Sequence, residues 1–367
     1  MAQFLAQLWE VLTRRVDSFL LGIALSIAGV GLITLFSASD QSVTRLTSQA
    51  ASLGFALMLM WIVANIPPQT IARIAVPLYV LGIAMLAGVA LWGITVNGSR
   101  RWLNLGFGRF QPSELMKIAL PLMLAWYFQK FEGRIGWKDF VLAAVLIAVP
   151  VYLIKRQPDL GTSLLIAASG FYVLYFAGLS WKVIAGLVAA AGAAAPLIWP
   201  HLRDYQRDRI LTFIDPTRDP LGAGYHSSQA SIALGSGGVV GKGWLNGTQT
   251  HLDFLPERHT DFIFAVFGEE FGLIGNAVLL VLYLMLIGRG LMITAGASTL
   301  FTRLIAGAIT LMFFTYAFVN MGMVSGVLPV VGVPLPLVSY GGTALTSLFI
   351  GLGILMSVQA HRKLVNT

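Results

Sequence analysis

The sequence predicts an all-α polytopic membrane protein of about ten transmembrane helices, with a long extracytoplasmic loop between the seventh and eighth. Three observations favour this class: hydrophobic residues make up 57% of the 367 residues, charged residues only 11%, and the mean hydropathy is +0.79. Soluble domains are about 25% charged, so a soluble chain of this composition could not cover its own surface. Cysteine is absent, which excludes disulfides and thiolate metal sites.

Apolar runs of roughly the 20 residues that a bilayer core requires recur along the whole chain. They predict ten spans, at 18–37, 47–66, 70–93, 113–129, 139–154, 161–178, 180–199, 262–287, 302–325 and 342–360. Residues 1–17 are expected to form a short cytoplasmic amphipathic segment and not a cleavable signal, because no basic stretch precedes an apolar core. No internal repeat or separable soluble domain is visible, so residues 1–367 are expected to form one integral-membrane domain.

Lysine and arginine in the short loops predict the orientation, because they accumulate on the cytoplasmic side. The side of both termini holds eleven, which are Arg14, Arg15, Arg73, Lys130, Arg134, Lys138, Lys182, Arg289, Arg303, Arg362 and Lys363. The opposite side holds six, which are Arg45, Arg100, Arg101, Arg109, Lys155 and Arg156. We therefore expect both termini in the cytoplasm and the loop 200–261 outside.

The outer side nevertheless carries many cations once the long loop is counted. Loop 200–261 adds six, which are Arg203, Arg207, Arg209, Arg218, Lys242 and Arg258. An anionic ligand would explain this excess. The alternative is a solvated loop whose cations pair with the carboxylates of residues 204–219. Nucleic acid is not expected as a partner, because the basic residues are scattered between apolar runs.

The segment 97–117 (NGSRRWLNLGFGRFQPSELMK) is predicted to be a glycine-rich loop that enters the fourth span. It carries three arginines, which are Arg100, Arg101 and Arg109. Glu114 and Lys117 are three residues apart and share a helix face. Because water is scarce there, the two are expected to pair. An ion pair within the membrane indicates a functional site or a bridge that locks two helices.

In the segment KRQPDLGTS at 155–163, Pro158 separates two spans. Asp159 then stands at the start of the sixth span, beside Lys155 and Arg156. A carboxylate at a helix start is often a cap, and a role in the site is the alternative.

The segment FLPERHTDFIFAVFGEEFG at 254–272 places five carboxylates, with Asp253, close together in an otherwise apolar chain. Asp261 is expected at the outer membrane boundary, as a helix cap or as a functional carboxylate. Glu257, Arg258 and His259 precede it, and His259 is expected to be a hydrogen-bonding neighbour and not a metal ligand. For Glu269 and Glu270, about two helical turns deeper, hydrogen bonds between helices are favoured.

Two glycine-rich segments are predicted to be irregular. The stretch 224–248 is expected to be irregular backbone packed over the bundle, and its SGGVVGKG lacks the outer residues of a Walker A loop. The stretch 332–344 contains Pro334, Pro336, Gly341 and Gly342, which prevent a regular helix. It is expected to line a cavity, with polar groups from Ser339 and Tyr340.

Taken together, these stretches resemble the SEDS (shape, elongation, division and sporulation) family. The matching stretches are FLPERHTDFIFA at 254–265, QPSELMK at 111–117, QPDLGTS at 157–163, RILTFIDPTRDPLGAGYH at 209–226 and PLVSYGG at 336–342. They cover nearly the whole chain in order. Arg258 and GKGWLNGTQ at 241–249 are closer to the RodA-type elongation branch than to the FtsW-type division branch, which more often has Ala at the position of Arg258.

The resemblance implies a peptidoglycan glycosyltransferase of the bacterial inner membrane. Such an enzyme polymerises lipid II into glycan strands on the outer face during cell elongation and releases undecaprenyl pyrophosphate. Asp261 matches the family's essential aspartate, which gives it the catalytic role. The implied partners are a class B penicillin-binding protein, which supplies transpeptidation, and other membrane proteins of the elongation complex.

The residues themselves fit this chemistry. Arginine and lysine suit a lipid pyrophosphate. Forming a β-glycosidic bond from an α-linked donor inverts the anomeric carbon and requires a base for the acceptor hydroxyl. Because pyrophosphate is a competent leaving group, cations can replace the acid of a glycosidase. The expected substrate-binding residues are Arg100, Arg101, Arg109, Glu114, Lys117, Lys155, Asp159, Lys242, Glu257, Arg258, His259, Ser339 and Tyr340.

Two other functions are compatible with the same features. A lipid II flippase would use the cations and intramembrane charges as a translocation path, and a non-catalytic scaffold would use the helices as docking surfaces. The absence of a visible inverted repeat and the boundary position of Asp261 count against the flippase. No cofactor is predicted, and a divalent cation is compatible with the sequence although no spaced metal motif occurs.

Overall fold

The computed structural model describes residues 15–96, 99–104, 109–157, 159–202, 204–215, 223–251 and 257–362. Within these ranges, ten helices of 17 or more residues coincide with the predicted spans: α2 (Ser18–Ala38), α3 (Val43–Asn65), α4 (Pro68–Trp92), α5 (Pro112–Lys130), α6 (Trp137–Arg156), α7 (Leu160–Phe176), α8 (Trp181–Ile198), α12 (Ile263–Ala295), α13 (Leu300–Val324) and α14 (Gly342–Ala360). Eight of them are long and apolar enough to cross a membrane. The other two are α7, which is shorter, and α5, which carries Glu114 and Lys117. The fold class is therefore confirmed.

Helices begin where the sequence supplies a cap or a proline. Asp17 and Asp159 accept hydrogen bonds from the backbone N–H groups of the first turns of α2 and α7, and Ser42 does the same for α3. Proline occupies the first position of α4 and α5, where its missing N–H has no intrahelical partner to lose. For Asp159 the structure thus confirms the cap.

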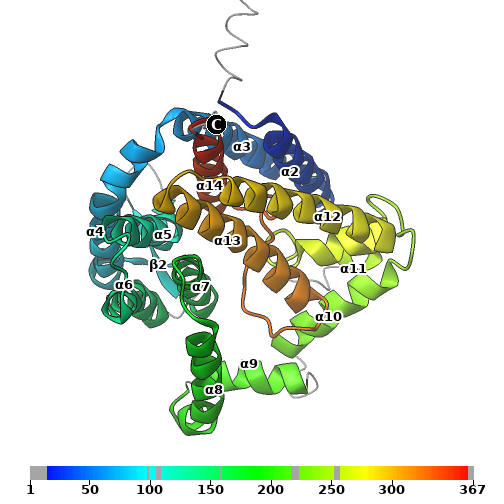
Figure 1. The fold of residues 1–367 in the computed structure, drawn as a ribbon. Helices are drawn as coiled ribbons and strands as arrows, with labels where there is room; N and C mark the ends of the chain where they lie inside the picture. The colour runs from blue at the N-terminus through cyan, green and yellow to red at the C-terminus, as the bar shows by residue number, and fades with distance from the viewer. Residues whose placement is uncertain are drawn as a thin grey trace, which may run out of the picture.

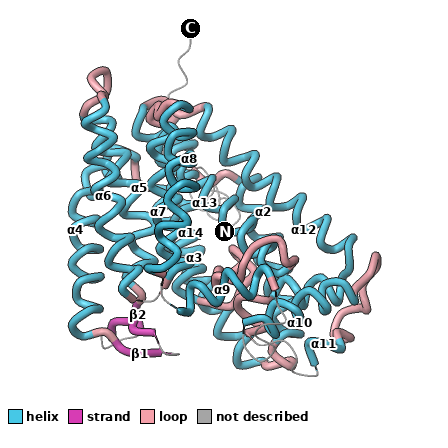
Figure 2. Tube along the Cα trace, turned by 90° about the horizontal axis from the view of Figure 1, so that it is seen from below, coloured by secondary structure: helices cyan, strands magenta, loops and turns pink. Residues whose placement is uncertain are grey.

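The helices form one bundle with two distinct ends. Figure 2 shows the strands β1 and β2 at the same end as α10 and α11, opposite to the C-terminus. We call these the hairpin end and the C-terminal end. In Figure 1, α12 and α13 cross the centre beside α14, and α8 projects away from the bundle. Helix α8 buries none of its residues, whereas α13 and α14 bury most of theirs.

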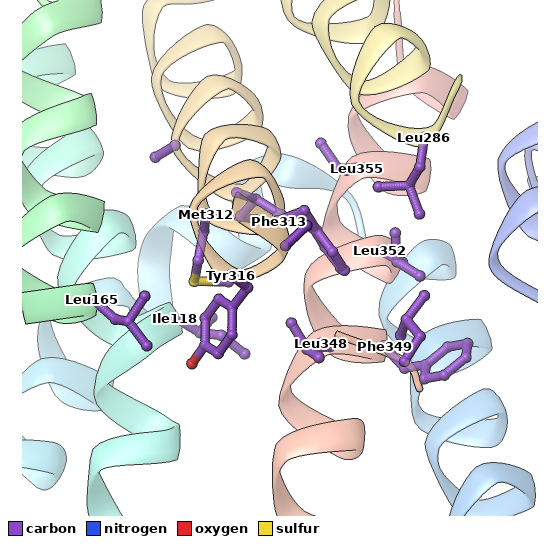
Figure 3. Packing of buried hydrophobic residues seen from close by; sticks show 14 of the residues in the cluster. Ile118, Leu165, Leu286, Met312, Phe313, Tyr316, Leu348, Phe349, Leu352 and Leu355 are labelled. Carbon is purple, nitrogen blue, oxygen red and sulfur yellow. The ribbon is translucent and has the colours of Figure 1, made fainter. Parts of the chain in front are cut away.

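The core lies where α5, α7, α13 and α14 meet. Figure 3 shows Phe313 of α13 facing the leucines of α14, and Met312 and Tyr316 on the side of Ile118 of α5 and Leu165 of α7. Tyr316 and Phe313 are almost wholly buried. Because α13 is enclosed by other helices, polar groups on it must find partners within the protein.

The predicted loop before α5 is in fact a small antiparallel sheet. Strands β1 (Ile94–Val96), β2 (Ser99–Asn104) and β3 (Arg109–Phe110) pair in that order. The signal that could have predicted the hairpin is Asn-Gly at 97–98, the dipeptide most typical of two-residue hairpin turns.

The long loop is also more regular than expected. It contains the 3-10 helix η1 (Trp199–His201) and the helices α9 (Asp204–Ile214), α10 (Ala223–Ser236) and α11 (Thr248–His251). The prediction of irregular backbone was therefore wrong for α10, which packs against α12, and it holds only for residues 237–247. Residues 1–14 of the predicted N-terminal segment lie outside the described part of the chain.

Helix α12 is interrupted at Gly272, whose φ of 65° is accessible to glycine. The segment 237–243 fills the break with its main chain. Leu273 N donates to Gly238 O at 2.9 Å, and Lys242 N donates to Glu269 O at 3.0 Å. A Cβ atom at Gly272 would lie 2.3 Å from Gly241 N. Irregular backbone is tolerated within a bundle where protein groups complete its hydrogen bonds in this way.

Candidate active site

Asp261 lies in the turn 257–262, which precedes α12 at the hairpin end. Thr260 N and Phe262 N both donate to Glu257 O, at 3.1 and 3.3 Å, and Glu257 has a left-handed φ of 47°. The N-cap position of α12 is Phe262 and has no side-chain cap. Asp261 is therefore not the helix cap, and its partly buried carboxylate lies next to Gly332.

The turn is fixed through three consecutive carbonyl groups. His259 O accepts from Tyr340 N at 2.9 Å, Thr260 O accepts from Ser339 Oγ at 2.6 Å, and Asp261 O accepts from Asn320 Nδ2 at 2.8 Å. The segment 325–341 and α13 thus orient three successive peptide units. The backbone that carries the Asp261 carboxylate is therefore held in place at three successive residues.

Ser339 and Tyr340 contact the turn, and their polar groups form hydrogen bonds within the protein. Ser339 Oγ donates to Thr260 O and accepts from Leu335 N at 2.8 Å. The Tyr340 ring contacts the His259 ring edge to face, with centroids 6.1 Å apart.

Glu257, Arg258 and His259, the predicted site residues of this turn, also interact within the protein. Arg258 donates to Thr250 O and pairs with Asp40 in the turn between α2 and α3. The Glu257 carboxylate accepts from Thr260 Oγ1 at 2.9 Å. Burial, and next the charge of Arg45, hold the pKa of His259 below its ordinary value, so its ring is neutral at neutral pH.

Glu114 and Lys117 form the predicted ion pair, with Lys117 Nζ 2.7 Å from Glu114 Oε1. Both are buried. Ser347 Oγ of α14 donates to Glu114 Oε2 at 2.7 Å, and Lys117 Nζ lies 4.9 Å from the centroid of the Tyr316 ring. The pair therefore connects α5 with α13 and α14.

Glu114 of this pair borders an apolar cavity of about 360 Å³. Helices α3, α5 and α14 line it with Phe55, Ile118 and Ile350 among others. Its polar lining residues are Ser52, Glu114, Thr343, Thr346 and Ser347.

The three predicted arginines differ in their surroundings. Arg100 donates to the last carbonyls of α4, Gly93 O at 2.7 Å, Leu91 O at 3.0 Å and Ala90 O at 3.2 Å. It thus caps a helix C-terminus. Arg101 pairs with the buried Asp159 at 3.4 Å and remains partly exposed. The side chain of Arg109 lies outside the described part of the structure.

The two remaining predicted lysines, Lys155 and Lys242, differ in their surroundings. Lys155 is exposed at the end of α6, and Asp159, expected beside it, pairs with Arg101 instead. Lys242 Nζ lies 2.7 Å from Oε1 of the fully buried Glu269 and donates to Thr248 Oγ1 at 2.7 Å. Lys242 therefore neutralises a buried carboxylate.

Glu269 was expected to form hydrogen bonds between helices, but it bonds to the long loop instead. Its carboxylate accepts from the backbone N–H groups of Gln249 at 2.9 Å and Thr250 at 3.2 Å, as well as from Lys242. Glu270 does match that interpretation, since it accepts from Ser37 of α2.

Comparison with known proteins identifies this arrangement. Residues 16–364 match the FtsW/RodA/SpoVE model, described as cell cycle protein. The chain belongs to the FtsW/RodA/SpoVE family. It is 49% identical over 351 residues to the peptidoglycan glycosyltransferase MrdB of Escherichia coli K12, covering 95% of each chain.

Two solved structures have a fold similar to that of this chain. A chain from a peptidoglycan synthase complex is 33% identical, with a TM-score of 0.83, covering 95% of this chain and 99% of that one. The rod shape determining protein RodA of Thermus thermophilus is 30% identical, with a TM-score of 0.72, covering 95% and 98%.

The site predicted from the sequence of this FtsW/RodA/SpoVE protein did not include Asn320. Its signal was available: a single amide within the apolar span 302–325 is costly unless it has partners. Among the described residues, no group of three or more His, Asp or Glu side chains could hold a metal ion.

Proposed function

We propose that this protein is a peptidoglycan glycosyltransferase that polymerises lipid II at the outer face of the bacterial inner membrane. The similarity to E. coli MrdB over 95% of both chains supports the activity. The observation that carries the mechanism is the Asp261 carboxylate, which stands on a turn with three restrained carbonyls at the hairpin end.

The hairpin end faces outward in this proposal and the termini are cytoplasmic, as the lysine and arginine distribution indicates. The chain is one integral-membrane domain, and the loop 200–261 covers the outer end of the bundle. The growing glycan and the carboxylate are then in the same compartment.

The apolar cavity between α3, α5 and α14 receives the polyprenyl chain of the substrate. Its wall is apolar along Phe55, Ile118 and Ile350, and Glu114 and Ser347 offer polar groups toward the pyrophosphate end. Lys117 pairs with Glu114 and holds its carboxylate beside the cavity. A lipid enters such a cavity laterally from the bilayer.

The reaction requires one base. Asp261 takes the proton from the 4-hydroxyl of the acceptor sugar while that oxygen attacks the anomeric carbon of the donor. The new C1–O bond forms as the bond from C1 to the phosphate oxygen breaks, with inversion, and undecaprenyl pyrophosphate leaves with the electron pair. Cations that bind the pyrophosphate oxygens stabilise the leaving group.

Arg101 is the best supported cation of the sequence-based set, because its side chain is 31% exposed and its ion pair with Asp159, at 3.4 Å, is longer than the 2.7 Å pair of Lys242 with Glu269. Lys155 adds an exposed charge near the same end. Arg100 and Lys242 are assigned structural roles here, because α4 carbonyls and Glu269 occupy them. Glu257, Arg258, His259, Ser339 and Tyr340 shape the turn around Asp261.

The partner is proposed to be a class B penicillin-binding protein, together with other membrane proteins of the elongation complex. The match to a chain from a synthase complex that coordinates polymerization and crosslinking supports a transpeptidase partner.

Polymerisation of lipid II by the purified protein tests the proposal. Asp261→Asn preserves shape but removes the base, and it should slow polymerisation at least about a hundredfold, the low end for general-base catalysis. Glu132→Gln, which changes an exposed carboxylate in the turn after α5, is the matched control and should polymerise at the wild-type rate. A folded Asp261→Asn protein with more than about a tenth of the wild-type rate would refute the role of Asp261.

A flippase is the second candidate, because the buried Glu114–Lys117 pair lies inside the bundle. Lipid II translocation in vesicles separates the two functions. Translocation without polymerisation by the wild-type protein would replace the glycosyltransferase with the flippase, and the absence of both would favour a scaffold.

A further inference from the structure

Asn320 connects the turn that carries Asp261 to the segment 325–341. It lies in the last third of α13 and is fully buried. Its Nδ2 atom donates to Asp261 O at 2.8 Å and to Val333 O at 2.7 Å. Because both partners are carbonyl oxygens, only the amide nitrogen can face them, and both of its hydrogens are used.

The two hydrogen bonds of Asn320 indicate a role beyond the packing of α13. A buried amide is costly without hydrogen bonds, so an apolar side chain would fill the same position more cheaply if it only packed. The partners are main-chain carbonyls of two segments that are far apart in the sequence. Asn320 therefore sets the distance between the turn 257–262 and the segment 325–341.

Gly332 shows why that distance matters to the carboxylate. The residue directly precedes Val333, and a Cβ atom built on it would lie 3.2 Å from Asp261 Oδ2. Its φ of +72° is in the left-handed region, which favours glycine. The bond from Asn320 to Val333 O thus holds the Gly332 backbone against one side of the Asp261 carboxylate.

We propose that Asn320 is a positioning residue, which orients the Asp261 carboxylate through the carbonyls of Asp261 and Val333, with Gly332 as the side-chain-free wall. The inference rests on the proposed function, in which Asp261 is the base. It makes the approach of acceptor hydroxyl to carboxylate depend on a residue that touches neither.

Asn320→Leu tests the amide, because leucine has a similar size and donates no hydrogen bond. A displacement of about 1 Å at a catalytic group can cost on the order of 100-fold in rate. We expect kcat for lipid II polymerisation to fall by about 30- to 100-fold, while KM stays within about threefold. Thr310→Val is the control, because Thr310 is equally buried in α13 but bonds only to Ala306 O of its own helix.

Gly332→Ala tests the wall and does not disturb the core, because Gly332 is exposed. Gly326→Ala is matched to it, since Gly326 lies in the same segment with a φ of +75°, and a Cβ there meets only Ser231 Oγ at 3.5 Å. Both variants introduce the same backbone strain. We expect kcat to fall at least about tenfold in Gly332→Ala and to stay within about twofold of wild type in Gly326→Ala.

A loss of rate equal in both glycine variants, or a folded Asn320→Leu protein within about threefold of the wild-type kcat, would overturn the proposal. So would a loss confined to KM. If Asn320→Leu does not fold, the glycine pair decides.

A labelling experiment separates this inference from the proposed function. The chain has no cysteine, so Asp261→Cys gives a single thiol on the turn. Adding Asn320→Leu should raise its rate of reaction with a soluble maleimide at least about fivefold, because the released turn exposes the partly buried side chain. An unchanged rate would overturn the positioning role even if the wild-type protein polymerises lipid II. A raised rate with no polymerisation by wild type would support the clamp and refute the enzyme.

Discussion

Glu269 should control whether the outer loop stays docked on the bundle. The side chain is fully buried, and its Oε1 atom accepts from Lys242 Nζ at 2.7 Å and Gln249 N at 2.9 Å. Its Oε2 atom accepts from Thr250 N at 3.2 Å and Thr250 Oγ1 at 3.0 Å. One carboxylate therefore holds Lys242 and the first turn of α11.

Glu269→Gln replaces one acceptor oxygen with an NH2 group. Fewer hydrogen bonds are lost if the NH2 group takes the Oε2 position. In that orientation the N–H of Thr250 loses its acceptor. An unsatisfied buried N–H costs about 1–3 kcal/mol. Loss of the Lys242 counter-charge adds about 1 kcal/mol, a low value because the Lys242 side chain is 28% exposed. We expect local opening to become easier by about 2–4 kcal/mol.

Hydrogen–deuterium exchange at Gln249 and Thr250 measures this free energy, because their amides exchange when the loop opens. A change of about 2–4 kcal/mol corresponds to a roughly 30-fold to several-hundred-fold faster exchange. Lys242→Met should give a smaller increase, and the double variant should fall short of the sum, because the two residues interact. Exchange within about threefold of wild type in Glu269→Gln would refute the reasoning.

Three further predictions follow from individual contacts. Arg101→Ala should weaken lipid II binding by roughly 10- to 150-fold, the value of a charge-assisted hydrogen bond of about 1.5–3 kcal/mol, whereas the exposed Arg73→Ala at the C-terminal end should leave binding unchanged; wild-type affinity in Arg101→Ala would remove Arg101 from the site. The pKa of His259 is held below its ordinary value by burial first and by Arg45 next, so the unfolded chain binds the proton first as the pH falls below about 6.5. The stability that His259 contributes is therefore complete above that pH and is lost as the pH falls toward its folded pKa, and His259→Gln should show a smaller drop in thermal midpoint between neutral and acidic pH; equal drops would contradict this. Single cysteines at the exposed positions Asp208 and Glu132 should react with an impermeant maleimide from opposite sides of the membrane, Asp208→Cys from outside, and labelling of both from one side would contradict the topology.

The spans could be predicted because their cause is local. A helix in a bilayer must satisfy its own backbone hydrogen bonds, so about 20 apolar residues predict a helix whatever surrounds it. The Glu114–Lys117 pair was equally accessible, since a separation of three residues places both side chains on one face. The position of Asp261 just before α12 was predicted from the apolar boundary at Phe262, whereas the turn that carries it was not.

The partners of the charged residues could not be predicted in this way. Arg100 is a residue type that often binds phosphate. Its guanidinium nevertheless donates to the carbonyls at the end of α4, because β2 packs against that helix. Lys242 and Glu269 are 27 residues apart and meet because the loop fills the break at Gly272. The composition of these segments indicated an anionic ligand. Which cation is available to bind that ligand depends on which carbonyls and carboxylates contact it in the folded protein.

The sequence by itself determined the membrane class and the helices, because hydrophobicity and spacing along one chain express local physics, and its resemblance to a known family singled out the carboxylate of the proposed chemistry. Only the tertiary structure decided how that carboxylate is aimed. Asn320 lies 59 residues from Asp261, and Ser339 lies 79 residues from Thr260. Hydrogen bonds of a few ångströms between such distant residues exist only after α12, α13 and the segment 325–341 have packed together, since direction and distance are properties of the packed helices and not of the residues in order.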